Sequence, residues 1–409
     1  MGGIDFFLLW AGAAVSLAEI WAGGLLAPLG FASGLLVVIF GHLIGNTPLA
    51  LGGLIGSRAG VSTMVGVRPS FGTRGSYFAS LLNVIQLVGW TGVMLWIGGK
   101  AAQAVSDLPG IGFRGWVAVM GVVTTVWALA GHRFWKWLHR IAVSGLLLLS
   151  VLMTWILVSE FGWGSLFRSA PGGGMPFMLG LDLVIAMPIS WLPLVSDYSR
   201  YSRGTWSAFW GTWIGYFIVS SWMYIVGLAA SIVTRSPTPD SMVMELMVSW
   251  GFVLPALIIV LFSTFTTTFL DIYSATVSSI NIWPHLDRSK GVIVCGALGT
   301  IVALLFPATA YEHFLTFIGS VFIPLFGIVL ADYFFLRGDR YTRGSFEREA
   351  EGWYRRGING WAFVSWTAGF LIYHMLQRFS QIGSSVPSLL AAAGLYLALM
   401  RVMRRPDAR

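Results

Sequence analysis

Charge is what this sequence has least of: 10% of its 409 residues are charged, against 56% hydrophobic residues and a mean hydropathy of +0.77. Soluble globular proteins carry about 25% charged residues, so water would solvate a folded surface of this chain poorly. The composition therefore argues against a soluble enzyme, a disordered chain and a nucleic-acid-binding protein. Cys295 is the only cysteine, which excludes a disulfide framework and a cysteine-based metal cluster.

Catalytic motifs are also missing. None of the lysines, Lys100, Lys136 and Lys290, precedes Ser or Thr as in a phosphate-binding P-loop, and neither HExxH nor GxSxG occurs. The six histidines are spread over different segments. The sequence therefore indicates neither an enzyme nor a cofactor, and a membrane-embedded enzyme is the weaker alternative.

The chain has long apolar runs instead. A membrane-spanning helix needs about 20 apolar residues, so the runs predict an all-α integral membrane protein with about 12 transmembrane helices. We expect spans at 4–28, 31–56, 76–105, 114–131, 140–160, 177–197, 206–233, 252–282, 291–307, 313–336, 361–377 and 386–403. No linker divides the chain, which predicts a single membrane domain over 1–409, with 238–250 as a short interfacial or loop helix.

The basic residues predict how these spans are oriented. With the N-terminus inside, 20 of the 25 Lys and Arg residues fall in cytoplasmic loops and the C-terminal tail. The other five, on the opposite side, are Lys100, Arg114, Arg168, Arg235 and Arg378. The positive-inside rule then predicts a multi-pass protein of a prokaryotic-type inner membrane with both termini in the cytoplasm. The same rule explains the net charge of +8 without a nucleic-acid partner.

Four acids lie inside the predicted spans, where ionisable groups are costly and usually functional. They are Glu19, Asp197, Asp271 and Asp332. Asp197 and Asp332 end their spans beside Arg200 and Arg337, so we expect structural ion pairs or gate contacts there. Glu19 and Asp271 have no Lys or Arg within a helical turn and are therefore the candidates for a functional role.

Helix breakers occur in the first and the sixth span. Gly23 and Gly24 weaken the first span after Glu19, and Pro188 and Pro193 interrupt the sixth. Interrupted helices at matching positions of two five-helix halves are typical of secondary transporters, whose substrate site lies where the breaks meet. A channel is disfavoured, because no repeated filter motif or ring of pore charges occurs.

Five motifs follow one another along the chain: SLAEIWAGG, the loop GSRAGVSTMVGVRPSFGTRGSYFAS, QLVGW, SDYSRYSRG and LADYFFLR. Together they resemble the nucleobase:cation symporter family 1, and within it the cytosine permeases and the hydroxymethylpyrimidine permeases that salvage a thiamine precursor. The resemblance implies a LeuT-like fold of two inverted five-helix repeats, 1–160 and 177–336, with discontinuous helices 1 and 6 and two added helices over 361–403. It also implies alternating-access symport of a heterocyclic base with Na⁺ or H⁺.

The resemblance further implies which residues bind substrate. Trp90 would stack on the base, a contact worth about 0.5–1.5 kcal/mol beyond burial, and Gln86 lies one turn earlier on the same helical face. The remaining substrate-binding candidates are Glu19, Ser190, Trp191, Thr268 and Asp271.

The acids set this chain apart from cytosine permeases, because Glu19 replaces a small polar residue there and Asp271 is added near Thr268. Two carboxylates favour an aminopyrimidine, with Glu19 as its main partner. A purine, a hydantoin or an amino acid stays open as the substrate.

The coupling ion has its own candidate ligands. By the resemblance, Na⁺ would bind carbonyls at Ala13 and Ser16 and hydroxyls of Thr266 and Thr267, joined by Ser263; a hard cation prefers such oxygen ligands. Alternatively, these hydroxyls bond to carbonyls of their own helix, and a proton couples through Glu19 or Asp271. No feature of the sequence indicates an oligomeric state.

Overall fold

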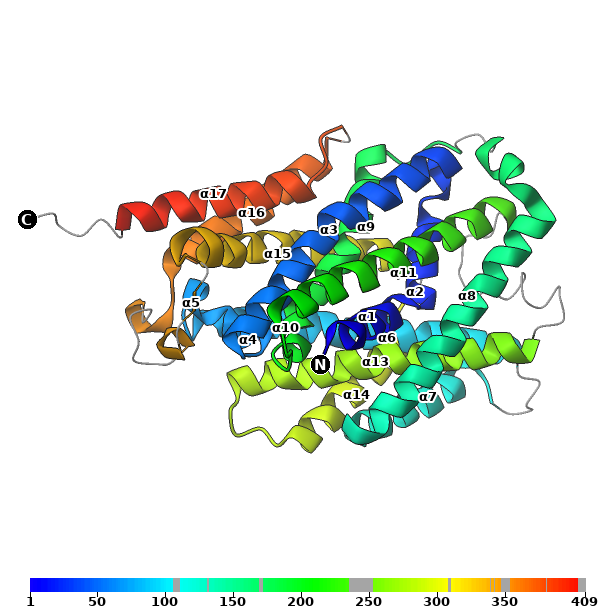
Figure 1. The fold of residues 1–409 in the computed structure, drawn as a ribbon, viewed down its shortest axis with the longest axis horizontal. Helices are drawn as coiled ribbons and strands as arrows, with labels where there is room; N and C mark the ends of the chain where they lie inside the picture. Colours follow the sequence, from blue (N-terminus) through cyan, green and yellow to red (C-terminus); the bar gives the residue numbers. More distant parts are fainter. Residues whose placement is uncertain are drawn as a thin grey trace, which may run out of the picture.

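The computed structural model describes residues 1–105, 111–130, 132–168, 172–234, 253–307, 310–338, 340–341, 343–346, 354–379 and 381–403. Over these residues the secondary structure is helical, without a strand (Figure 1). The segment 238–250, predicted as an interfacial helix, lies outside them.

Each of the predicted spans coincides with a helix or a helix pair. In chain order these are α1 (Gly3–Ala14) with α2 (Leu17–Leu25), α3 (Phe31–Ala59), α6 (Gly75–Val105), α7 (Phe113–Leu129), α8 (His132–Arg168), α9 (Phe177–Trp191) with α10 (Val195–Ser199), α11 (Thr205–Thr234), α13 (Val253–Ile282), α14 (Arg288–Leu305), α15 (Tyr311–Ala331), α16 (Gly360–Gln377) and α17 (Ser385–Met403). Among the described residues, seven helices are long and apolar enough to cross a membrane, or up to nine if each of two bent pairs counts as one span.

The first span is broken, but not where the glycines predicted. α1 and α2 meet at an angle of 59°, and the break lies at Val15 and Ser16, before Glu19, whereas Gly23 and Gly24 lie inside α2. Ser16 is extended (φ −142°, ψ 153°), and its side chain caps α2 by accepting a hydrogen bond from the Glu19 N–H. A capping serine therefore decides where the helix restarts.

The sixth span also differs from its prediction. Pro188 lies inside α9, which continues to Trp191, and the irregularity is a 3₁₀ turn over Leu192–Leu194 that contains Pro193. α10 follows directly. The interruption is therefore a tightened turn one helical turn beyond Pro188, without the sharp bend of the first span.

Helix contacts repeat in pairs along the chain. α3 packs on α11, and α6 packs on α13, so the helices five spans apart face each other. The contact of α1 and α2 with α11 has its counterpart in α9 with α3, and the contact of α6 with α14 has its counterpart in α13 with α7. This pattern is the one expected of two inverted five-helix repeats.

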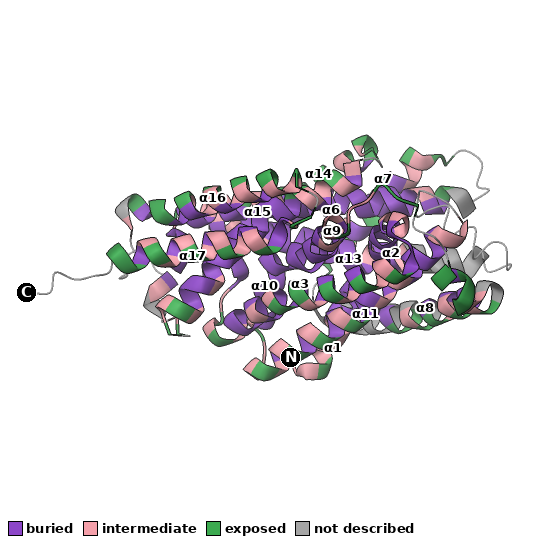
Figure 2. Cartoon of the chain, turned by 90° about the horizontal axis from the view of Figure 1, so that it is seen from above, coloured by how far each residue is buried: buried purple, intermediate pink, exposed green. Residues whose placement is uncertain are grey.

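α16 and α17 pack on α15, next to this core. In Figure 2 they form one end of the molecule, and the most deeply buried residues lie where α6, α9, α13 and α15 come together.

Two glycines set the distance between the half-helix α2 and α11. A Cβ atom at Gly23 would collide with the backbone of Tyr224, and one at Gly227 with the carbonyl oxygen of Ile20. The two backbones touch because neither position has a side chain. This close approach brings side chains of α11 beside Glu19.

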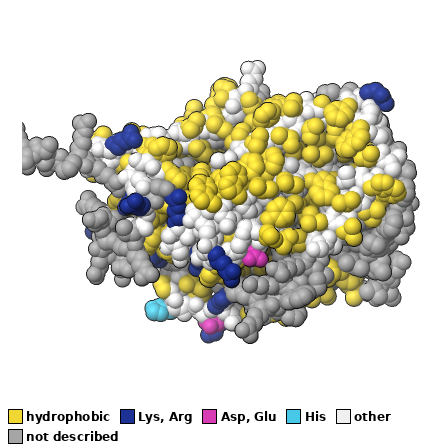
Figure 3. Space-filling model, in the orientation of Figure 1, with side chains coloured by type: hydrophobic (Ala, Val, Ile, Leu, Met, Phe, Trp, Pro, Cys, Tyr) yellow, Lys and Arg dark blue, Asp and Glu magenta, His cyan; other side chains and the backbone are white. Residues whose placement is uncertain are grey.

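The outer surface is apolar over a wide belt, and charged side chains lie at its margins (Figure 3). α14 presents the exposed side chains of Ile293, Val294, Leu298, Ile301 and Leu305, and α11 those of Trp206, Trp210, Ile214 and Ile218. A lipid bilayer is the environment that stabilises such a surface.

The basic loop between α3 and α6 is hydrogen-bonded to α13 and to the segment that follows α15. Arg68 donates to the Asn281 side chain at 2.6 and 3.1 Å, and Arg337 donates to the Pro69 carbonyl at 3.0 Å. Arg337 also pairs with Asp332 at 2.9 Å, which confirms the expected ion pair. Asp197 instead accepts a hydrogen bond from the Thr63 N–H at 3.1 Å.

Candidate substrate and cation sites

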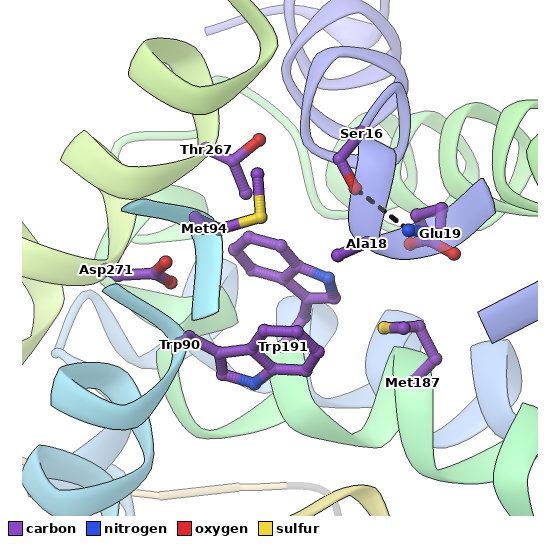
Figure 4. A pocket seen from close by; sticks show the side chains of 9 residues that line it. All are labelled: Ser16, Ala18, Glu19, Trp90, Met94, Met187, Trp191, Thr267 and Asp271. Carbon is purple, nitrogen blue, oxygen red and sulfur yellow. Dashed lines mark hydrogen bonds between the residues drawn. The ribbon is translucent and has the colours of Figure 1, made fainter. Parts of the chain in front are cut away.

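A closed cavity lies where α2, α6, α9 and α13 meet (Figure 4). Its free volume is about 10 Å³, roughly the space of one water molecule, so a substrate would require the side chains around it to move apart. Its lining residues are Ser16, Ala18, Glu19, Trp90, Met94, Met187, Trp191, Thr267 and Asp271. All of these side chains are at most 7% exposed, so the site is occluded from both sides of the protein.

Two indole rings form one side of the cavity. Trp90 from α6 and Trp191 from α9 lie near each other in Figure 4, with Met94 and Met187 beside them. Edge-on contacts fix both rings from behind, Trp90 by Phe314 (ring centroids 5.2 Å apart) and Trp191 by Trp10 (6.0 Å). Flat aromatic surfaces held in this way suit a planar heterocycle.

Unpaired polar atoms gather at the same place. Trp90 Nε1, Gln86 Oε1 and Asp271 Oδ2 are buried and have no hydrogen-bond partner within the described chain. Buried polar atoms without a partner are rare in folded proteins, because each costs about 1–3 kcal/mol. Trp90 and Asp271 line the cavity, so one donor and one acceptor are available there to a ligand.

Glu19 lies on the opposite side of the cavity from Asp271 (Figure 4), and its carboxylate points away from the tryptophans. Its oxygens are engaged by α11: Tyr216 donates to Oε1 at 2.5 Å, and Ser220 contacts Oε2 at 2.7 Å. Glu19 was the expected main partner of the substrate, but both of its carboxylate oxygens already contact protein hydroxyls. Asp271 is the acid with a free oxygen.

Three other predicted substrate residues lie beside the cavity without lining it. Gln86 donates to the Asn83 side chain at 2.8 Å and to the Ser190 carbonyl at 2.9 Å, so it bridges α6 to α9. The Ser190 hydroxyl donates to the Met187 carbonyl of its own helix. Thr268 is buried, and its hydroxyl has no hydrogen-bond partner in the described part of the chain. Its neighbour Thr267 lines the cavity instead.

Three of the predicted cation ligands, Ser16, Ser263 and Thr267, lie at the break of the first span. Ser263 of α13 donates to the Val15 carbonyl at 3.2 Å, and Ser16 and Thr267 line the same cavity. The Ala13 carbonyl lacks the backbone hydrogen bond from Leu17 that an unbroken helix would make. Carbonyl and hydroxyl oxygens of this kind are the donors that a hard monovalent or divalent cation prefers, so the residues present fit the expected site.

The threonine hydroxyls also bond to carbonyls of their own helix, which was the alternative to a cation site. Thr266 and Thr267 donate to carbonyls of α13, at 2.9 Å to Phe262 and 3.0 Å to Ser263. Each hydroxyl oxygen keeps lone pairs for a cation while its hydrogen is used in this way.

Sequence reasoning missed the partners of Glu19. Tyr216 and Ser220 of α11 contact Glu19, and His42 of α3 contacts Ser220; no motif marks any of the three in these apolar helices. His42 had been set aside with the other histidines, although an ionisable residue in the middle of a predicted span is itself a functional signal.

Comparison with known proteins identifies the family of the chain. A family model described as permease for cytosine/purines, uracil, thiamine, allantoin matches residues 2–397. The cytosine permease of Escherichia coli (strain K12) is 27% identical over 393 residues, which cover 95% of this chain and 88% of the relative. The hydantoin permease of Microbacterium maritypicum is 25% identical over 368 residues, covering 84% of this chain and 73% of the relative.

Solved structures show the same fold. Mhp1, a nucleobase-cation-symport-1 family transporter in a closed conformation with bromovinylhydantoin bound, superposes with a TM-score of 0.86 at 21% identity, covering 98% of this chain and 92% of that one. A Na⁺-coupled sialic acid symporter superposes with a TM-score of 0.69 at 12% identity, covering 99% and 90%. The LeuT-like fold expected from the motifs is thus confirmed. The chain belongs to the permease family for cytosine and purines, uracil, thiamine and allantoin, and it is therefore a transporter, not an enzyme.

Proposed function

We propose that the protein imports an aminopyrimidine, such as cytosine or a hydroxymethylpyrimidine, into the cell across a prokaryotic-type inner membrane. The observation that carries this proposal is the pairing of two tryptophan faces with an unpaired buried carboxylate oxygen, Asp271 Oδ2, in one closed cavity. An aminopyrimidine has a flat ring for the indoles and an amine edge for the carboxylate.

Asp271 takes the role that the sequence had given to Glu19. A carboxylate accepts hydrogen bonds from an exocyclic amine and a ring N–H, and such charge-assisted bonds are roughly twice as strong as neutral ones. Gln86 Oε1 is a second acceptor and Trp90 Nε1 a donor for a ring nitrogen or carbonyl. A uracil-like ring has no exocyclic amine and could reach the Asp271 oxygen only through a ring N–H beside a carbonyl, so it is disfavoured.

For the cation, we propose that Na⁺ binds at the break between α1 and α2. Ala13 and Ser16 would contribute carbonyl oxygens, and Ser263, Thr266 and Thr267 of α13 the hydroxyls. Since Ser16 and Thr267 also line the cavity, a cation there would hold the half-helix in the position that closes the cavity around a substrate.

Uptake into proteoliposomes tests both parts. Radiolabelled cytosine, hydroxymethylpyrimidine, uracil, hypoxanthine and hydantoin are offered with and without an inward sodium gradient. We expect the two aminopyrimidines to accumulate and sodium to raise their uptake. Preferred uptake of hydantoin or hypoxanthine would contradict the aminopyrimidine assignment. Equal uptake with and without sodium would contradict the assignment of Na⁺ as the coupling ion.

A further inference from the structure

We propose that Asn83 and Gln86 of α6 are positioning residues that hold the irregular turn of the sixth span in place, and that they thereby make the substrate cavity select single-ring over two-ring bases. The part about ring size rests on the proposed function, because it takes the cavity as the place where a planar base binds. The hold on the turn rests on hydrogen bonds alone. Neither residue of this amide pair lines the cavity.

The amide pair reaches the backbone of the sixth span. Gln86 Nε2 donates to the Ser190 carbonyl at 2.9 Å, and Asn83 Nδ2 donates to the Pro193 carbonyl at 3.3 Å. Gln86 Nε2 also donates to Asn83 Oδ1 at 2.8 Å, so the two side chains support each other. Asn83 Nδ2 donates in addition to Ser278 Oγ of α13 at 2.8 Å. The pair therefore joins α6, the turn and α13.

The orientation of both amides follows from their partners. A backbone carbonyl only accepts, so the nitrogen of each amide must face its carbonyl. Asn83 Nδ2 and Gln86 Nε2 then each use both of their hydrogens, and Asn83 Oδ1 accepts from Gln86. A leucine has nearly the shape of asparagine but can make none of these bonds.

The turn needs donors from outside its own helix. Pro193 has no N–H, so regular α-helical hydrogen bonding cannot continue through it. Leu192–Leu194 forms a 3₁₀ turn instead, in which hydrogen-bond geometry is poorer. Asn83, Gln86 and Pro193 lie in the interior, and both amides are fully buried, where a carbonyl oxygen without a partner is costly. The amide pair supplies partners at this place.

These bonds end beside the cavity wall. The Ser190 carbonyl belongs to the peptide group that precedes Trp191, and Trp191 lines the cavity together with Trp90 (Figure 4). Trp90 lies one helical turn after Gln86 on α6. Gln86 thus joins the helix that carries one indole to the peptide group next to the other. The amide pair fixes where the wall formed by α9 stands relative to α6.

This wall has to yield when a substrate enters, because the free volume of the cavity is about 10 Å³. The 3₁₀ turn follows Trp191 directly and moves with it. A two-ring base covers a larger area in its plane than a single ring and requires a larger displacement of the wall. The amide bonds oppose this displacement, so they favour the smaller base without touching it.

Hydrogen exchange tests the hold without any substrate. In Asn83→Leu, the backbone amides over 192–199 should exchange faster with deuterium than in the parent, measured by mass spectrometry of the purified protein. Asn46→Leu is the matched control, because Asn46 is equally buried and its bond runs to the Trp213 carbonyl of α11 at 3.5 Å. Exchange over 192–199 at the parent rate in Asn83→Leu would overturn the hold.

Uptake by proteoliposomes tests the selection. Cytosine and adenine are the pair of substrates, since both carry an exocyclic amine and differ in having one ring or two. The ratio of cytosine to adenine uptake should fall about tenfold in Asn83→Leu, which corresponds to the loss of about one buried hydrogen bond. It should keep the parent value in Asn46→Leu. A loss of stability alone lowers both uptakes and leaves the ratio unchanged.

A parent-like ratio in Asn83→Leu would overturn the selection by the amide pair. If Asn83→Leu does not reach the membrane, Asn83→Ala with Asn46→Ala as its control takes its place in both experiments. If the parent takes up neither base, the proposed function fails, and hydrogen exchange still decides whether the amide pair holds the turn.

Discussion

Asp271 and Glu19 lie on opposite sides of one cavity, but only Asp271 has a carboxylate oxygen without a hydrogen-bond partner. Both oxygens of Glu19 are engaged by Tyr216 and Ser220. Two acids with different surroundings take different tasks. Asp271 is free to bind a ligand, and Glu19 is held by two residues of the neighbouring helix α11. The predictions that follow depend on this division.

Asp271→Asn should weaken aminopyrimidine binding by about 1.5–3 kcal/mol, the range for hydrogen bonds to charged groups. Tryptophan fluorescence of the purified protein titrated with substrate measures the affinity. Asp287→Asn is the matched control, because Asp287 caps α14 at the surface and lies outside the cavity. Unchanged affinity in Asp271→Asn, with a loss in Glu19→Gln at constant pH, would return the substrate contact to Glu19.

Trp90→Ala should also weaken binding, since the base loses a stacking surface worth about 0.5–1.5 kcal/mol beyond its buried area. Trp90→Phe should recover part of this loss, because it keeps an aromatic face but no N–H. Trp206→Ala provides the control, as Trp206 is 61% exposed on the outer surface. Equal affinity in the parent and Trp90→Ala, measured by calorimetry, would contradict a stacking role.

Much of the fold could be predicted because its signals are local. Twenty-odd apolar residues make a span whatever its neighbours are, and each of the predicted spans was found as a helix or helix pair. The break in the first span was placed too late, because Gly23 and Gly24 indicated flexibility whereas the Ser16 cap determines where α2 begins. Gly23 instead serves the contact with α11.

The site was harder to predict because it depends on which helices meet. Four of the seven predicted substrate residues line the cavity, namely Glu19, Trp90, Trp191 and Asp271. Gln86, Ser190 and Thr268 do not, and Thr267, predicted as a cation ligand, lines the cavity in place of Thr268. The direction of the Glu19 side chain depends on Tyr216 and Ser220, which are about two hundred residues away in sequence. No pattern along one helix encodes such a contact.

Thr267→Val should raise the sodium concentration that gives half-maximal uptake, because valine keeps the shape of threonine and removes one oxygen ligand of a hard cation. Thr276→Val is the matched control on α13, since its hydroxyl donates to the carbonyl of Ile272 in its own helix, away from the break. Initial rates of substrate uptake over a series of sodium concentrations give the comparison. Identical sodium dependence in the two variants would show that Thr267 is no ligand.

Cysteine labelling checks the orientation predicted from the basic loops. Arg340→Cys and Arg114→Cys replace exposed residues on the two predicted sides, and the native Cys295 is buried. In intact cells, an impermeant maleimide should label Arg114→Cys and leave Arg340→Cys unlabelled until the membrane is opened. The reverse pattern would place the termini outside.

Gly227→Ala should destabilise the protein by roughly 1–3 kcal/mol or more, the usual cost of overpacking a tight interior. The added methyl would meet the backbone of Ile20, which cannot turn aside as a flexible side chain would, so α2 and α11 must separate. Separation also moves Ser220 away from the Glu19 carboxylate that it contacts. Gly394→Ala in α17 is the control, because a Cβ atom there meets nothing within 4 Å and alanine favours a helix by about 1 kcal/mol over glycine. Thermal unfolding in detergent should therefore show a lower midpoint for Gly227→Ala and an equal or higher one for Gly394→Ala. A parent-like midpoint in Gly227→Ala would mean that the close contact between α2 and α11 does not contribute to stability.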